Sequence, residues 1–253
     1  MSKVIFHAPG AEYLMPYLHR IFPAKGDIQL FEDVAAGATP QAHTAVMISS
    51  ASAPAAESAA KAAEDVSGKL TQGGTPKAAS ATPGKLTKAE QAFVDECTRA
   101  GLRYFILRAA PIVCTGMQGE VRRLAEDIYR GRFFHLPGNE ARMSVVHATD
   151  IAAATRHLLE SDLPSAVYNI TDGDDPTVRE LAEALAYRMN DKRISTASTK
   201  PQQWLLRMLY GSERLARYTV DTVYSSAPLM ATGFVPTPVC TYLRTHVYDH
   251  DSL

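Results

Sequence analysis

The chain has 253 residues, a length that suits one large domain or a domain with a smaller lobe. Its 26 Lys and Arg nearly balance its 27 Asp and Glu, which excludes the strongly basic surface that nucleic acids and anionic membranes attract. We therefore expect neither a nucleic acid nor a membrane as a partner.

Targeting segments and metal sites are not expected either. The first residues lack a signal-peptide pattern, and no apolar stretch is long enough to span a bilayer. Three widely spaced cysteines, Cys97, Cys114 and Cys240, form neither a disulfide framework nor a metal-binding motif. We expect reduced thiols, no metal and a cytoplasmic location.

The first fifty residues predict a strand–helix–strand unit and a third strand. An apolar strand ending near residue 7 leads through Pro9 and Gly10 into a helix over 12–22, whose Leu14 and Leu18 share one apolar face. A second strand follows at 28–31, and a third apolar strand at 45–49 runs into a serine-rich turn.

The composition changes after residue 51 to Ala, Ser, Gly, Lys and Pro, with few large apolar side chains. Such a segment buries too little surface to offset the entropy of ordering it. We expect residues 54–85 to be flexible and to be cut first by a protease.

From residue 88 onward, strands and helices alternate again, which implies a parallel α/β sheet. A capping box at Thr177–Glu180 opens one helix, and Thr149 or Asp150 is expected to cap another that starts at residue 151. The predicted elements are helices at 88–100, 121–128, 151 onward and 177–189, and strands at 104–107, 143–147 and 166–171.

Four segments lie in a recognisable order: ILRAAPIV (106–113), LPGNEARMSVVHATDIAAA (136–154), VYNITDGDDPTVRELAEALA (167–186) and GFVPTP (233–238). Together they resemble the extended short-chain dehydrogenase/reductases, the NAD-dependent epimerase/dehydratase family. The resemblance covers residues 88 to 253 well and 1–50 loosely.

The resemblance implies an α/β fold, a Rossmann-like parallel sheet with a smaller C-terminal helical substrate lobe. Residues 1–116 are then the nucleotide-binding region and 117–253 the substrate lobe, with the strand at 166–171 returning to the main sheet. It also implies NAD or NADP as cofactor and a nucleotide-sugar or related small molecule as ligand, and it raises a homodimer as an assembly to test.

The cofactor turn departs from the family pattern. Family members carry GxxGxxG there, whereas Ala8, Ala11 and Leu14 stand roughly at those places. A Cβ obstructs the approach of a pyrophosphate and the close packing of helix on strand, so we expect cofactor binding to be weakened or lost. About a dozen residues separate the second and third strands, so the nucleotide-binding region is expected to lack one or two strands. The cofactor contacts implied are Ala8, Gly10, Ala11, Glu32, Asp33 and Arg108.

Alternatives remain for two of these assignments. Glu32 and Asp33 end the second strand, where they would accept hydrogen bonds from a ribose or simply be solvated. Arg108 is either a cofactor contact or the partner in a buried ion pair.

The catalytic positions depart as well. The family uses Tyr-x-x-x-Lys, in which the lysine lowers the pKa of the tyrosine. Aligning Lys88 with that lysine puts Gly84 at the tyrosine position, while the alternative, Lys85, puts Ala81 there, and no tyrosine occurs between residues 45 and 101. The remaining catalytic candidates are Ser50, Ser52 and Lys88, and for each a capping or solvated role is the alternative.

The substrate contacts that the resemblance implies are Met117, His147 and Asn169, for which structural roles are equally open. Two functions follow. One is an epimerase/dehydratase-like protein with weakened cofactor binding, and the other is a non-catalytic relative that binds a ligand or a protein.

Overall fold

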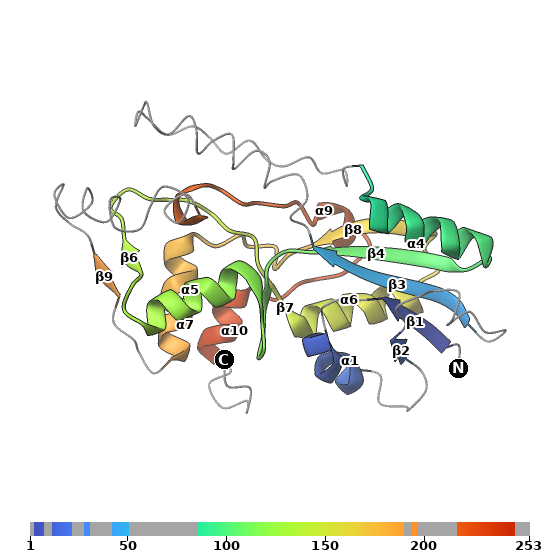
Figure 1. The fold of residues 1–253 in the computed structure, drawn as a ribbon, viewed down its shortest axis with the longest axis horizontal. Helices are drawn as coiled ribbons and strands as arrows, with labels where there is room; N and C mark the ends of the chain where they lie inside the picture. The colour runs from blue at the N-terminus through green and yellow to red at the C-terminus, as the bar shows by residue number, and fades with distance from the viewer. Residues whose placement is uncertain are drawn as a thin grey trace.

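The centre of the fold is a five-stranded parallel sheet in the order β2-β1-β3-β4-β8 (Figure 1). The computed structural model describes residues 3–7, 12–21, 28–30, 42–50, 85–189, 194–196 and 217–245. The strands of the sheet are β1 (Lys3–His7), β2 (Ile28–Leu30), β3 (Ala42–Ser50), β4 (Arg103–Ala109) and β8 (Ala166–Ile170). The alternation of predicted strands and helices is thus confirmed as a parallel α/β fold.

Helices cover both faces of this sheet (Figure 1). One face, which includes Val46 and Phe105, packs against α1 (Met15–Ile21), entered through the 3-10 turn η1 (Glu12–Leu14), and against α6 (Ala148–Glu160). The opposite face, which includes Met47 and Ile106, packs against Phe93 of α4 (Lys88–Arg99). The two faces alternate along each strand, as the period of a β-strand requires.

A group of helices lies beyond the sheet and holds the C-terminal part of the core (Figure 1). It consists of α5 (Gly119–Tyr129), α7 (Val178–Arg188) and α10 (Val239–Thr245), and the short α9 (Ala227–Met230) lies beside β8. Two small parallel ladders connect this region: β5 (Ile112–Val113) with β7 (Val146–His147), and β6 (Phe134–His135) with β9 (Ser195–Thr196).

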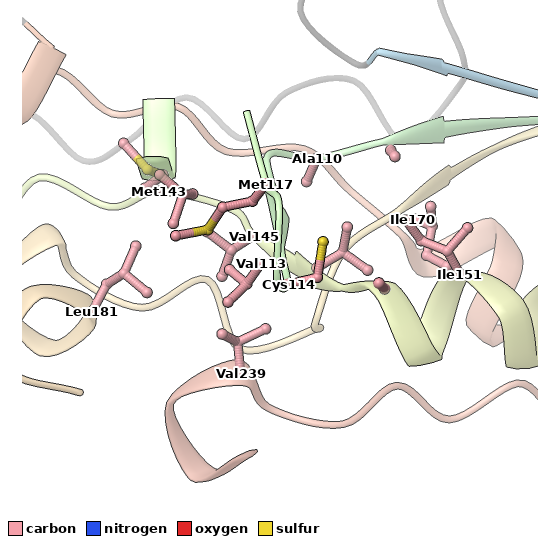
Figure 2. Packing of buried hydrophobic residues seen from close by; sticks show 14 of the residues in the cluster. Ala110, Val113, Cys114, Met117, Met143, Val145, Ile151, Ile170, Leu181 and Val239 are labelled. Atoms are coloured by element: carbon pink, nitrogen blue, oxygen red, sulfur yellow. The ribbon is translucent and has the colours of Figure 1, made fainter. Parts of the chain in front are cut away.

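One apolar cluster joins the helical group to the sheet. It runs from Leu14 and Leu18 through the strands to Leu181 and Leu243. Figure 2 shows Val113, Val145 and Val239 gathered where β5, the approach to β7 and the start of α10 meet. In the part of the chain that the structure describes, no helix is both long and apolar enough to cross a bilayer.

Two predicted boundaries were wrong. The strand expected over 143–147 contains only two residues, because Met143 and Ser144 instead hydrogen-bond to Pro176 and Thr222 through their backbone N–H groups. Helix α6 begins at Ala148, and its N-cap is His147 and neither Thr149 nor Asp150.

Candidate functional site

The order of the strands marks one edge of the sheet as a ligand site. From β1 the chain passes to β2 on one side and then to β3 on the other, so the strand order reverses between β1 and β3. In open parallel sheets, ligands bind at the carboxyl ends of the strands beside such a reversal. The candidate site therefore lies where β1 ends at His7 and β3 ends at Ser50.

Most of the predicted cofactor contacts lie outside the described residues. This holds for Ala8, Gly10, Ala11, Glu32 and Asp33, and also for the catalytic candidate Ser52 and the expected flexible segment up to residue 84. For Ser50 the structure gives the backbone, which pairs with Ala109 on β4.

The turn that leads into α1 is less suited to binding a dinucleotide than the strand order of the sheet is. Leu14 closes the turn η1 with its side chain only 1% exposed, packed in the main core. A glycine in this part of a dinucleotide-binding turn allows the helix to pack close to its strand. Here a leucine side chain fills space between the helix and the core, and α1 itself has seven residues. The strand order therefore marks a candidate site, while Leu14 prevents the close packing of helix on strand that a glycine there allows.

A buried carboxylate organises the neighbouring strand ends. Glu90, in the first turn of α4, accepts hydrogen bonds from Ser49 Oγ (2.7 Å) and from Arg108 Nε (2.8 Å) through Oε1. Its Oε2 accepts from Arg108 Nη2 (2.7 Å) and from the Thr87 backbone N–H (2.8 Å). Ser49, Arg108 and Asn169 occupy adjacent register positions on β3, β4 and β8, so all three belong to the face that α4 covers.

The hydrogen bonds to Glu90 decide whether Arg108 is a cofactor contact or the partner in a buried ion pair. Burial raises the pKa of Glu90, but the hydrogen bonds from Arg108, Thr87 and Ser49 outweigh burial and lower the pKa to about 2. Glu90 is thus ionised at neutral pH, and Arg108 is its partner in a buried ion pair, with Nη2 also donating to the Lys85 carbonyl (3.2 Å). Of the two alternatives for Arg108, the structure contains the ion pair.

Sequence reasoning missed Glu90, although a signal for it was present. Thr87 and Glu90 form a capping box, with each side chain accepting from the other residue's backbone N–H. The pattern Thr-x-x-Glu before an apolar helix predicts that box, as it did at Thr177. It does not predict that the same carboxylate also pairs with Arg108.

Lys88 is the first residue of α4 and its side chain is exposed. A lysine can lower the pKa of a tyrosine one helical turn away, but the position four residues earlier is Gly84, which has no side chain. Lys88 therefore begins α4 with no tyrosine four residues before it.

Other tyrosines near this edge do not replace the missing one. Burial, and then the nearby Cys114, raise the pKa of Tyr13, which disfavours the phenolate that a base would need. The Tyr17 hydroxyl accepts a hydrogen bond from the Thr115 backbone N–H (3.3 Å), and its ring is buried.

Each of the three predicted substrate contacts is packed against, or hydrogen-bonded to, other residues of the protein. Met117 is buried in the main core, to which Met143 also belongs (Figure 2). Asn169 donates from Nδ2 to the Ser225 carbonyl (3.2 Å), and His147 accepts from the Thr149 N–H (3.2 Å) through Nδ1. Contact with a ligand at these three residues stays a prediction.

Two buried aspartates hold the start of α10. Asp150 accepts from the Thr237 N–H (2.7 Å), and Asp172 accepts from the Val239 N–H (3.1 Å). Asp150 does not cap α6, because it is the third residue inside that helix. Burial raises the pKa of both carboxyls, that of Asp172 to about 6, although the backbone hydrogen bonds act in the opposite direction. Among the described residues, no group of His, Cys, Asp and Glu could hold a metal ion.

A parallel sheet with a central reversal of strand order, helices on both faces and an added C-terminal helical group is the fold of the extended short-chain dehydrogenase/reductases. Comparison with solved structures supports this fold. The chain is similar to the Thermus thermophilus UDP-glucose 4-epimerase solved with NAD, with 16% identity, coverage of 96% of this chain and 97% of that one, and a TM-score of 0.60.

Two further solved structures show the same likeness. One is the human epimerase family protein SDR39U1 with NADPH, with 12% identity, coverage of 97% and 99%, and a TM-score of 0.57. The other is the Thermotoga maritima UDP-glucose 4-epimerase with UDP-glucose, with 14% identity, coverage of 96% and 97%, and a TM-score of 0.57. No family model and no curated protein matches the sequence. At these identities the likeness establishes the fold.

Proposed function

We propose that this protein binds NAD or NADP weakly at the carboxyl edge between β1 and β3, together with a nucleotide-sugar or related small molecule. We propose further that it has little or no hydride-transfer activity. The observation that carries the binding is the reversal of strand order at that edge. Structures of similar fold were solved with NAD or NADPH, which supports the choice of cofactor.

Low affinity follows from the entry to α1. The buried Leu14 side chain keeps the helix start from packing closely on the sheet, and the turn before it carries only Gly10. The free N–H groups at the helix start still attract an anion. We therefore expect dissociation constants in the high micromolar range or weaker, about −5 kcal/mol or less favourable.

Low activity follows from the acid/base group. When bound, a nicotinamide cofactor supplies the hydride donor or acceptor. The chain must exchange the proton of the substrate hydroxyl, and Lys88 has no tyrosine at helical spacing. Loss of a general acid/base lowers rates by a factor of about 10² to 10⁴.

Calorimetry with NAD, NADH, NADP and NADPH, followed by UDP- and dTDP-sugars, tests the binding. Weak heats that saturate in the high micromolar range or above support the proposal. Submicromolar affinity contradicts the role given to Leu14, and no binding of any nucleotide supports instead a module that binds other ligands or a partner protein.

Turnover on a panel of sugar nucleotides tests the chemistry with three proteins: the wild type, Gly84→Tyr and the matched control Gly84→Phe. We expect a slow wild type, a gain in the tyrosine variant and no gain in the phenylalanine variant. A wild-type rate of about 1 s⁻¹ or faster, the usual order for enzymes, would show that another residue supplies the acid.

A further inference from the structure

A chain of hydrogen bonds runs in one direction from the turn after β8 to the sulfur of Met230. The Gly173 backbone N–H donates to Thr171 Oγ1 (3.1 Å). The Thr171 hydroxyl donates to Ser226 Oγ (3.1 Å), and the Ser226 hydroxyl donates to Met230 Sδ (3.6 Å). Thr171 and Ser226 are buried, so the chain connects the interior to a thioether, which is a weak acceptor.

Met230 is the exposed end of this chain. It is the last residue of α9, which lies beside β8 (Figure 1), and it is 42% exposed. The other methionines that the structure describes are either buried in the core, at 6% exposure or less, or partly buried against it. They are Met47, Met117 and Met143, and Met15 and Met189, respectively. Of the described methionines, Met230 is therefore the one that a reagent in solution reaches most readily.

Gly173 adds to this accessibility. A Cβ at that position would lie 3.8 Å from Met230 Sδ and 3.9 Å from its Cε. The backbone of Gly173 has a φ of +76°, in the left-handed region that favours glycine. The conformation of the turn thus keeps position 173 from contributing a side chain that would cover the sulfur.

We propose that Met230 is an oxidation site, at which a hydroperoxide converts the thioether into a sulfoxide and the change is passed to the end of β8. The sulfur lone pair attacks the outer oxygen of the peroxide, and the O–O bond breaks as the S–O bond forms. The proton of the outer oxygen moves to the departing oxygen, which leaves as water or an alcohol. The sulfur loses two electrons and the peroxide gains them, and methionine sulfoxide reductases reverse the change.

Oxidation replaces a weak acceptor at the end of the chain by a strong one, because a sulfoxide is polar where a thioether is not. The Ser226 hydroxyl then donates to the new oxygen, and Thr171 responds with it, since linked hydrogen bonds polarise one another. The neighbouring Ser225 carbonyl accepts from Asn169 Nδ2 (3.2 Å). A movement of this segment therefore also reaches a side chain on β8.

Peptide mass spectrometry after graded exposure to hydrogen peroxide tests the site. In the folded protein we expect Met230 to be oxidised about tenfold faster than Met47, Met117 and Met143, because burial protects a thioether from the reagent. In denaturant the four rates should become similar. Similar rates in the folded protein would overturn the assignment of the site.

Two-dimensional ¹⁵N spectra test how the change is passed on. We expect oxidation of the wild type to shift the Thr171 backbone amide and the Asn169 side-chain amide, and reduction by methionine sulfoxide reductases to restore both. Met230→Leu has a similar volume but forms no sulfoxide, so this matched control should show neither shift. In Ser226→Ala, Met230 should still be oxidised, while the two signals move less than about half as far as in the wild type.

An oxidised wild type without these shifts would overturn the proposal, as would equal shifts in Ser226→Ala. If Ser226→Ala does not fold, Met230→Gln decides the matter. Its amide oxygen gives the Ser226 hydroxyl a strong acceptor, so both signals should differ from those of Met230→Leu without any peroxide. Identical signals in these two variants would overturn the proposal.

Discussion

At the level of single residues, the Glu90 carboxylate connects β3, β4 and the start of α4. It is 1% exposed and accepts hydrogen bonds from Ser49, Thr87 and Arg108. Neutralising it removes the carboxylate that pairs with the buried Arg108 guanidinium. Removal of one partner from a buried pair costs about 3–5 kcal/mol, far more than the net contribution of the intact pair.

We therefore expect Glu90→Gln to lower the free energy of unfolding by about 3 kcal/mol at pH 7. The pKa of Glu90 in the folded protein is lowered to about 2, so its contribution is complete above the ordinary carboxyl range and disappears as the pH falls toward 2. Denaturant titrations from pH 7 to 2.5 should show the two proteins converging. Glu126→Gln, in the exposed pair with Arg122, is the control, and a loss there as large as at position 90 would contradict this account.

At the level of elements, η1 and α1 contribute Leu14 to the main core, but the same leucine makes the start of α1 poorly suited to a cofactor. We expect Leu14→Ala to cost about 2–5 kcal/mol of stability, because it leaves a cavity in the main core. We expect it to leave NAD affinity within about twofold, because alanine keeps the Cβ that stops the helix from packing as closely on its strand as glycine allows. Chemical denaturation and calorimetry on the same samples measure both. Met15→Ala, at a half-buried neighbour, should cost clearly less, and a large gain in affinity from Leu14→Ala would show that the side chain directly blocks the cofactor.

The elements that sequence predicted best are those with strong local signals. Helices α4 and α7 combine an apolar face with Thr-x-x-Glu, and β4 contains an apolar run that is followed by Arg108 and Ala109. The cap of α6 was missed because histidine is an unusual cap, and Asp150 beside it was the better candidate on propensity. In the candidate site, the ion pair of Arg108 was one of two open alternatives. Its partner Glu90 could not be predicted, because the pair forms only once α4 docks on the sheet.

At the level of the whole molecule, one core extends from α1 through the sheet to α10. We expect a single calorimetric transition on heating, with no separate unfolding of the helical group. Leu243→Ala, at a buried position on α10, should lower the midpoint of that one transition by several degrees, about 2–4 °C for each kcal/mol lost. Two resolved transitions, only one of which moves in the variant, would contradict the continuity of the core.

The parallel pairing of the strands also affects how fast the chain folds. Every neighbouring pair of described strands is parallel, so none is closed by a hairpin. The partners in β3 and β4, and in β4 and β8, are separated by about 60 residues, and each loop must close before its ladder forms. Folding is then slow for a chain of this size, and strand edges stay open to other chains in the meantime. The concentration at which the protein can be refolded is thus limited by the lifetime of those open edges and not by the stability of the finished core.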